Sequence, residues 1–120
     1  MAGDIVNFRL SKRASEVAVL LKETGYFEHA LAAAKFALGY AVKNHYDEID
    51  PATYTVPDSD GSNYSIGSLD SDGQLSKLLL AIYPETTTPY LYARALMVFG
   101  LLKLGDRIEQ EGLPQISALL

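Results

Sequence analysis

Basic and polar side chains near the amino terminus are the residues most able to do chemistry in this sequence. Asn7 and Arg9 alternate along one short segment, and Lys12 and Arg13 begin the next. Arginine and asparagine recognise guanine and adenine in the major groove of DNA, and cationic side chains neutralise phosphates. Lys12 and Arg13 would oppose the dipole of a helix that starts there, so a bound phosphate would explain their position. Pairing of both with Glu16 is the competing explanation.

Other kinds of site find no support in the sequence. The Asp-Ser-Asp-Gly segments at 58–61 and 70–73 lack the ligand spacing and final glutamate of a calcium-binding loop, so they predict turns. His29 and His45 would face about 160° apart on one helix and could not share a metal ion. The chain has no cysteine, and it has no P-loop, dinucleotide fingerprint or nucleophile elbow. We therefore expect a protein that is not an enzyme and uses no metal ion or cofactor.

Length and charge narrow the class of protein further. The 120 residues suit one domain, and the net charge of −5 is unevenly spread. Residues 1–45 carry a net charge of +2 and the remainder −7. The basic part could bind nucleic acid, and the acidic part could bind a basic partner. The alternative is that both parts are simply solvated surfaces. No apolar run approaches the roughly 20 residues that span a bilayer, and no signal peptide is evident, so we expect a cytoplasmic protein without membrane contact.

Alternation of apolar and polar residues predicts a short strand over residues 4–10. Its inward residues would be Val6, Phe8 and Leu10, and its outward residues Ile5, Asn7 and Arg9. A lone strand leaves backbone donors and acceptors unpaired, and the same strand of a second subunit could satisfy them in a symmetric ribbon. We therefore expect a homodimer or a dimer of dimers.

Two helices are predicted to follow this strand. Ser11 is a typical N-cap for a helix over 12–23, which would end at Gly25. A longer, alanine-rich helix over 27–44 would be the central packing element, and Gly39 would let another helix approach it closely.

The second half of the chain predicts a loop and two more helices. Residues 50–73 are rich in proline, aspartate, serine and glycine, which favours a loop or short hairpin over 46–73. A helix over 74–83 would precede a last helix that Thr88 caps and Pro89 begins, running to about residue 110. Tyrosines would pack these two helices together: Tyr83, Tyr90 and Tyr92. The apolar tail after Gly112 would pack on the domain or on a neighbouring subunit.

The order of strand, helix and helix over residues 1–45 resembles the ribbon-helix-helix DNA-binding fold. The segment Asn-Phe-Arg-Leu-Ser at 7–11 and the helix end Glu-Thr-Gly at 23–25 carry this resemblance. It implies that Ile5, Asn7 and Arg9 face the major groove from a ribbon shared by two subunits. The fold class expected is thus mainly α: a ribbon-helix-helix-like unit (1–45), a loop or hairpin (46–73) and a helical part (74–120), in a single domain.

Over about residues 8–104 the chain also resembles the DndE family of bacterial DNA sulfur modification (phosphorothioation). The matching segments are Arg-Leu-Ser at 9–11, Thr-Gly at 24–25, Val-Pro-Asp-Ser-Asp at 56–60, Ile-Gly-Ser-Leu at 66–69, Leu-Leu at 78–79 and Phe-Gly-Leu-Leu at 99–102. The resemblance implies a small, non-catalytic accessory protein, a homodimer or tetramer that associates with nicked or non-specific DNA and with other DNA modification proteins. Its DNA contacts would come from Asn7, Arg9, Lys12 and Arg13. The alternative is a structural protein–protein interaction module without direct DNA contact.

Overall fold

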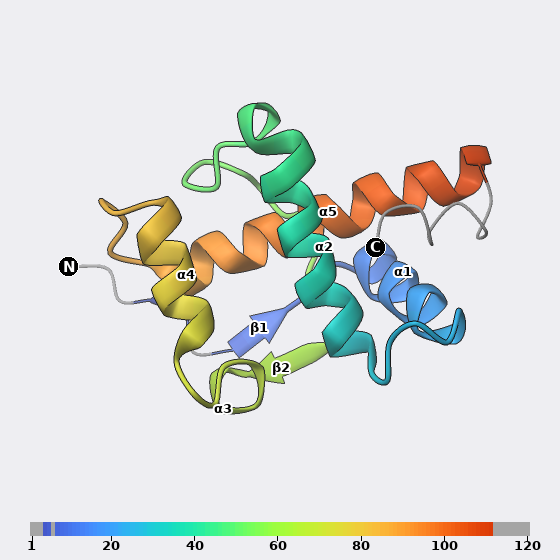
Figure 1. Cartoon of the computed structure of the whole chain (residues 1–120), viewed down its shortest axis with the longest axis horizontal. Coiled ribbons are helices and arrows are strands. Elements are labelled where there is room, and N and C mark those ends of the chain that lie inside the picture. The colour runs from blue at the N-terminus through green and yellow to red at the C-terminus, as the bar shows by residue number, and fades with distance from the viewer. Residues whose placement is uncertain (1–3, 6, 112–120) are drawn as a thin grey trace.

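The structure, a computed structural model, describes residues 4, 5 and 7–111. Its elements are, in order, β1 (Asn7–Arg9), α1 (Lys12–Glu23), α2 (Ala30–His45), a 3-10 turn η1 (Tyr46–Glu48), β2 (Asn63–Ser65), α3 (Ile66–Leu69), α4 (Gln74–Ile82) and α5 (Pro89–Glu111). The expected fold, mainly helical with an amino-terminal strand and an intervening loop, is confirmed (Figure 1). The expectations for Val6 and for the apolar tail after Gly112 fall outside the described residues.

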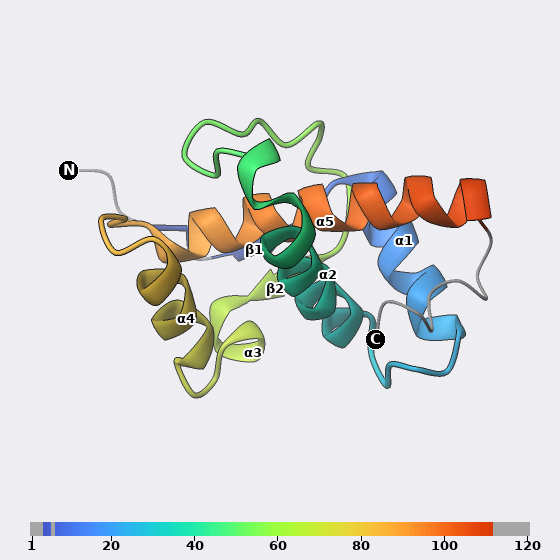
Figure 2. The ribbon, with the colours of Figure 1, turned by 45° about the horizontal axis from the view of Figure 1, so that its top comes forward.

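Helix α5 runs along the long axis of the molecule, and α2 crosses it near its middle (Figures 1 and 2). The two backbones meet at Gly100, where an added Cβ would lie 2.1 Å from the carbonyl oxygen of Ala37. This confirms α2 as a central packing element. The residue that permits the close approach is Gly100, however, and not Gly39. Gly39 is exposed, and an added Cβ there would meet nothing within 4 Å.

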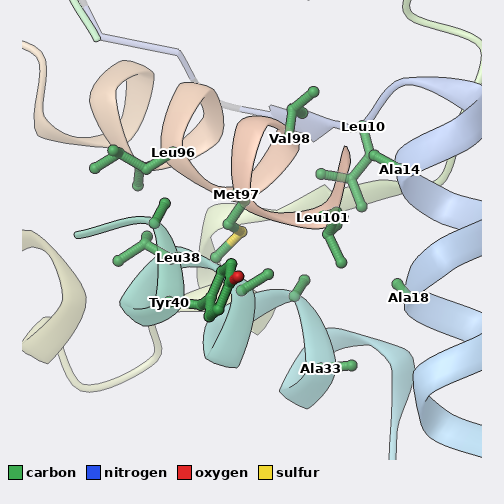
Figure 3. Close-up of a cluster of buried hydrophobic side chains, with 14 of the residues drawn as sticks. Leu10, Ala14, Ala18, Ala33, Leu38, Tyr40, Leu96, Met97, Val98 and Leu101 are labelled. Carbon is green, nitrogen blue, oxygen red and sulfur yellow. The ribbon is translucent and has the colours of Figure 1, made fainter. Parts of the chain in front are cut away.

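The hydrophobic core lies where α1, α2 and α5 come together. Small residues of α2 line it opposite larger side chains of α5 (Figure 3). Its largest fully buried side chains are Phe8, Leu10, Val17, Leu21, Leu69, Leu79, Leu96, Met97, Val98, Leu101 and Leu104. Burying an aliphatic or aromatic side chain of this size stabilises a fold by about 1.5–3 kcal/mol, so this cluster fixes the positions of strand and helices.

The predicted bounds and caps of α1 are confirmed. The side-chain oxygen of Ser11 accepts a hydrogen bond from the backbone N–H of Ala14 at 3.2 Å, and Gly25 follows the helix with a φ of 87°. Helix α2 begins later than the predicted residue 27, because His29 is still extended, with φ −137° and ψ 152°. The short helix α3 was not predicted, since its four residues are too few to show helical periodicity.

Helix α5 begins at Pro89 as predicted, but its amino-terminal amides are bonded by a residue from the other end of the chain. The carboxylate of Asp4 accepts hydrogen bonds from the backbone N–H groups of Tyr90 and Leu91 at 2.8 and 3.0 Å. A carboxylate at this position also interacts favourably with the positive end of the helix dipole. Asp4 is thereby tied to the start of α5, and Thr88 contributes only its carbonyl, to the N–H of Tyr92.

The expectation of a lone strand that pairs with a second subunit is wrong. Strand β1 pairs antiparallel with β2 of the same chain, with Asn7 opposite Ser65, Phe8 opposite Tyr64 and Arg9 opposite Asn63. Hydrogen bonds from Leu10 N–H to the Ser62 carbonyl and from Gly61 N–H to the Leu10 carbonyl, both 2.9 Å, extend the pairing. The backbone groups that seemed to require a partner subunit are therefore satisfied within one chain.

Candidate nucleic-acid interface

Strands β1 and β2 form a two-stranded ribbon with one buried and one exposed face. Phe8 is fully buried, and Tyr64 opposite it packs against the core. The exposed side chains are the polar ones: Asn7, Arg9, Asn63 and Ser65. These four residues are called the ribbon face below. An antiparallel pair places opposed side chains on the same face, so Asn7 lies beside Ser65 and Arg9 beside Asn63.

The ribbon face contains two of the four predicted contact residues and two that the sequence did not suggest. Asn7 and Arg9 are exposed as expected, whereas Ile5 is half-buried and packs against the core instead of facing outward with them. Asn63 and Ser65 were missed, although their segment does alternate polar and apolar residues. Nothing in that alternation says that the segment pairs with residues 7–9.

Contacts around Arg9 hold the ribbon in place. The Arg9 guanidinium donates one hydrogen bond, of 3.2 Å, to the carbonyl oxygen of Gly61. Arg94 of α5 donates from its Nε to the Arg9 carbonyl at 2.8 Å, so the other edge of β1 is engaged as well. A guanidinium has five N–H donors, and Arg9 therefore keeps most of its capacity for another acceptor.

Lys12 lies beside the ribbon, at the first position of α1. Its side chain is exposed, but its backbone N–H donates to the carboxylate of Asp58 at 2.7 Å. Hydrogen bonds from the amides of Lys12 and Asp60 hold the pKa of Asp58 below its usual value. Asp58 thus occupies the place at the helix start where a phosphate would bind, and only the Lys12 ammonium group remains available to one.

Arg13 is engaged elsewhere in the fold. Its guanidinium pairs with the carboxylate of Glu109, near the end of α5, at 2.5 Å. Neither Lys12 nor Arg13 forms an ion pair with Glu16 in the described part of the chain. The structure therefore brings Asn7, Arg9 and Lys12 together and directs Arg13 toward α5.

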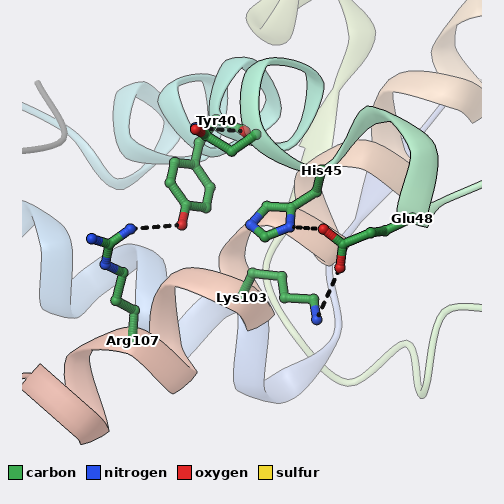
Figure 4. Close-up of polar contacts among 6 residues, drawn as sticks. Tyr40, His45, Glu48, Lys103 and Arg107 are labelled. Carbon is green, nitrogen blue, oxygen red and sulfur yellow. Dashed lines mark hydrogen bonds and ion pairs between the residues drawn. The ribbon is translucent and has the colours of Figure 1, made fainter.

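A second polar cluster joins η1 to α2 and α5 (Figure 4). His45 Nδ1 bonds to Glu48, and Lys103 Nζ lies 3.7 Å from the same carboxylate. The hydrogen bond from His45 is the main cause of a lowered pKa at Glu48. Arg107 donates to the Tyr40 hydroxyl at 3.3 Å. Each charged group in this cluster has an opposite charge or a hydrogen-bond partner nearby. This arrangement is more typical of contacts that hold helices together than of a ligand-binding site.

Asp70 is the one ionisable side chain among the described residues that is buried with its charge. Its carboxylate accepts hydrogen bonds from the backbone amides of Leu75 and Ser76, at 2.9 and 3.0 Å, and from the Tyr90 hydroxyl at 2.8 Å. Burial raises the pKa of Asp70, whereas these three hydrogen bonds lower it. The lowering effect is the larger, so the pKa of Asp70 lies below its usual value. Asp70 therefore fastens the start of α4 to the start of α5.

Packing of Tyr83 against Tyr92, with ring centres 5.2 Å apart, adds to the junction of α4 and α5. Together with the bond from Tyr90 to Asp70, it confirms the expected packing of these two helices by tyrosines.

We predict that Asp70→Asn destabilises the protein at neutral pH by about 1–3 kcal/mol, because an amide cannot accept all three hydrogen bonds as a carboxylate does. A lowered pKa in the folded state means that the carboxylate stabilises the fold above the unfolded-state pKa of about 3.9. That stabilisation is lost as the pH falls through the folded-state pKa. Urea unfolding at pH 7 and at pH 3 should therefore show a smaller difference between the two proteins in acid. A difference that stays constant with pH would contradict this role of the charge.

Within the described residues, no three His, Asp or Glu side chains gather closely enough to hold a metal ion. No helix of that part is both long and apolar enough to cross a membrane. Comparison with protein-family models, with curated proteins and with solved structures found no match to the chain.

Proposed function

We propose that this protein is a small, non-catalytic DNA-associated accessory protein, similar to DndE proteins of DNA sulfur modification. The observation that carries the proposal is the ribbon face, Asn7, Arg9, Asn63 and Ser65, displayed on a two-stranded antiparallel ribbon. The major groove admits a two-stranded β-ribbon, and side chains of these types hydrogen-bond to base edges there. Contact would thus come from one chain's own ribbon and would not require a ribbon shared between subunits.

Phosphate contacts in this proposal come mainly from Lys12. It lies three residues beyond Arg9, and its ammonium group forms no ion pair within the described residues. The nearby Asp58, which accepts from the Lys12 backbone amide, still attracts this charge. Arg13 contributes less, because DNA would have to displace Glu109 from it. The net charge of −7 on residues 46–120 opposes wrapping of DNA, so binding should be weak and confined to the ribbon side.

Fluorescence anisotropy with a labelled duplex, intact or nicked, tests the proposal. Neutralising one phosphate contributes about −0.9 to the slope of log affinity against log salt. Lys12→Ala should therefore make the slope shallower by about one unit, whereas Arg13→Ala should change it little. Arg9→Ala should instead reduce the preference between duplexes of different sequence, because it removes a base contact.

Lys22→Ala is the matched control for this experiment. Lys22 lies in the last turn of α1, at the end of the helix away from the ribbon, and its loss removes the same charge. An equal effect of Lys22→Ala and Lys12→Ala would mean that only net charge matters. Absence of binding to either duplex at ~10 μM protein and low salt, where even non-specific affinity registers, would contradict DNA association.

The alternative function, a protein–protein interaction module without DNA contact, is favoured by α4. Leu78 and Leu80 on this helix are 48% and 41% exposed. They lie on two different sides of α4, because residues two apart in a helix do not face one another. Either exposed leucine could also take part in self-association, so the proposed homodimer or tetramer fits both functions. Multi-angle light scattering measures the assembly: a dimer or tetramer is expected, and a monomer would contradict it.

A further inference from the structure

A pocket of about 230 Å³ lies between α5 and the segment 51–56. Its wall on α5 is formed by Leu91, Arg94 and Ala95, which share one face of the helix. The opposite wall contains Pro51, Ala52, Tyr54 and Val56. Five of the seven lining residues are aliphatic or proline, Tyr54 is aromatic and Arg94 is charged, and polar atoms make up slightly more than half of the surface that the pocket exposes.

Arg94 is held in a fixed orientation but is not neutralised. Its Nε donates to the Arg9 carbonyl at 2.8 Å and its Nη2 to the Ser59 hydroxyl at 3.4 Å, and both acceptors are uncharged. No carboxylate of the described residues lies within ion-pair distance of it. Its Nη1 has no protein acceptor among those residues. In a chain with a net charge of −5, a half-buried arginine without an acidic partner is an uncommon arrangement.

Contacts within the protein also hold the opposite wall of the pocket in place. Asp50 begins a tight turn in which its carboxylate accepts from the Ala52 amide at 3.1 Å and its carbonyl from the Tyr54 amide at 2.9 Å. The Tyr54 ring packs edge-on against Phe99 with centres 5.8 Å apart. Its hydroxyl has no hydrogen-bond partner within the described residues. Burial raises the pKa of Tyr54, so the hydroxyl stays protonated and able to donate at neutral pH.

We propose that this pocket binds a small organic anion, a carboxylate or phosphate group joined to an apolar or planar body. The anionic group accepts hydrogen bonds from the Arg94 guanidinium and the Tyr54 hydroxyl, and the body packs against Pro51, Leu91 and Ala95. Ligand pockets combine an apolar lining with a few placed polar groups in this way, and a guanidinium fits both kinds of anion. The proposal does not rest on DNA association, because the pocket lining includes no ribbon-face residue.

Titration of ¹⁵N-labelled protein with phenyl phosphate and, separately, with benzoate tests the proposal. Saturable shifts of amide signals over 52–56 and 91–95 are expected, with a dissociation constant of about millimolar for a ligand of this size. Binding of one probe alone identifies the anion as phosphate or carboxylate, and binding of both supports the shared chemistry. Benzyl alcohol and inorganic phosphate, each carrying half of the ligand, should bind at least about tenfold more weakly.

Two variants of lining residues and one control outside the lining complete the test. Arg94→Gln should weaken binding about tenfold or more by removing the charge, but it also changes contacts to β1. Ala52→Leu fills the pocket from an exposed position and should abolish binding without affecting the fold, and Thr55→Leu, exposed but outside the lining, should leave binding unchanged. Absence of saturable shifts, equal binding of benzyl alcohol or of inorganic phosphate, or unchanged binding by Ala52→Leu would each overturn the proposal.

Discussion

Gly100→Ala is expected to destabilise the protein by about 2–3 kcal/mol, the upper part of the range of about 1–3 kcal/mol found for overpacking a well-packed core. The new Cβ would lie 2.1 Å from the Ala37 carbonyl oxygen and 2.8 Å from its carbon. Both atoms belong to the backbone of α2, so relief requires the two helices to move apart along a buried interface. This loss should exceed the gain of about 1 kcal/mol that alanine brings over glycine in a helix. Midpoints of urea unfolding measure the difference.

Gly39→Ala is the matched control. It is also a mid-helix glycine, but it is exposed and an added Cβ meets nothing within 4 Å. Only the helix-propensity term remains there, so the variant should be more stable by about 1 kcal/mol. If both variants moved the midpoint in the same direction, the packing role assigned to Gly100 would be wrong.

Phe8→Asp is expected to leave the chain unfolded at 25 °C. Truncating a buried phenylalanine costs about 3–5 kcal/mol, and burial of an unpaired carboxylate adds several more. The sum reaches the range of about 5–15 kcal/mol that is typical of whole domains. Phe8 is fully buried beneath the ribbon, next to Leu10 in the core, so no exposed rotamer is available without detaching β1. Circular dichroism should show loss of helix.

Asn7→Asp introduces the same carboxylate one residue earlier, on the exposed ribbon face. Surface substitutions of this kind change stability by about 0.5 kcal/mol or less, so this variant should unfold at nearly the wild-type midpoint. A folded Phe8→Asp protein, or an Asn7→Asp protein equally destabilised, would contradict the assignment of the two faces of β1.

Local signals in the sequence predicted the helices well. Ser11, Gly25 and Pro89 mark helix ends through side-chain capping, positive φ and fixed φ, and all three act within a few residues of their position. What could not be predicted depends on residues far apart in the chain. The capping of α5 by Asp4 joins residues 86 apart, and the pairing of β1 with β2 joins a strand to a loop segment more than fifty residues later.

In the candidate interface, too, local features could be predicted from the sequence and long-range contacts could not. Exposure of Asn7 and Arg9 followed from the alternation around buried Phe8, and exposure of Lys12 from its place at the start of α1. Of the two explanations open for Arg13, a bound phosphate and pairing with Glu16 in its own helix, the structure shows neither: its partner is Glu109, because α1 packs along the end of α5. Arg94 gave no signal, since an arginine in a long helix is ordinary until its neighbours in space are known.

Mapping the contact surface on the folded protein tests the proposed function most directly. Amide signals of ¹⁵N-labelled wild-type protein are followed at low salt as unlabelled duplex DNA is added. The proposal predicts that the largest shifts fall on the ribbon face, Asn7, Arg9, Asn63 and Ser65, and on Lys12, and that they disappear as salt is raised. Shifts confined to other surfaces, such as α4, or no shifts at all would contradict it.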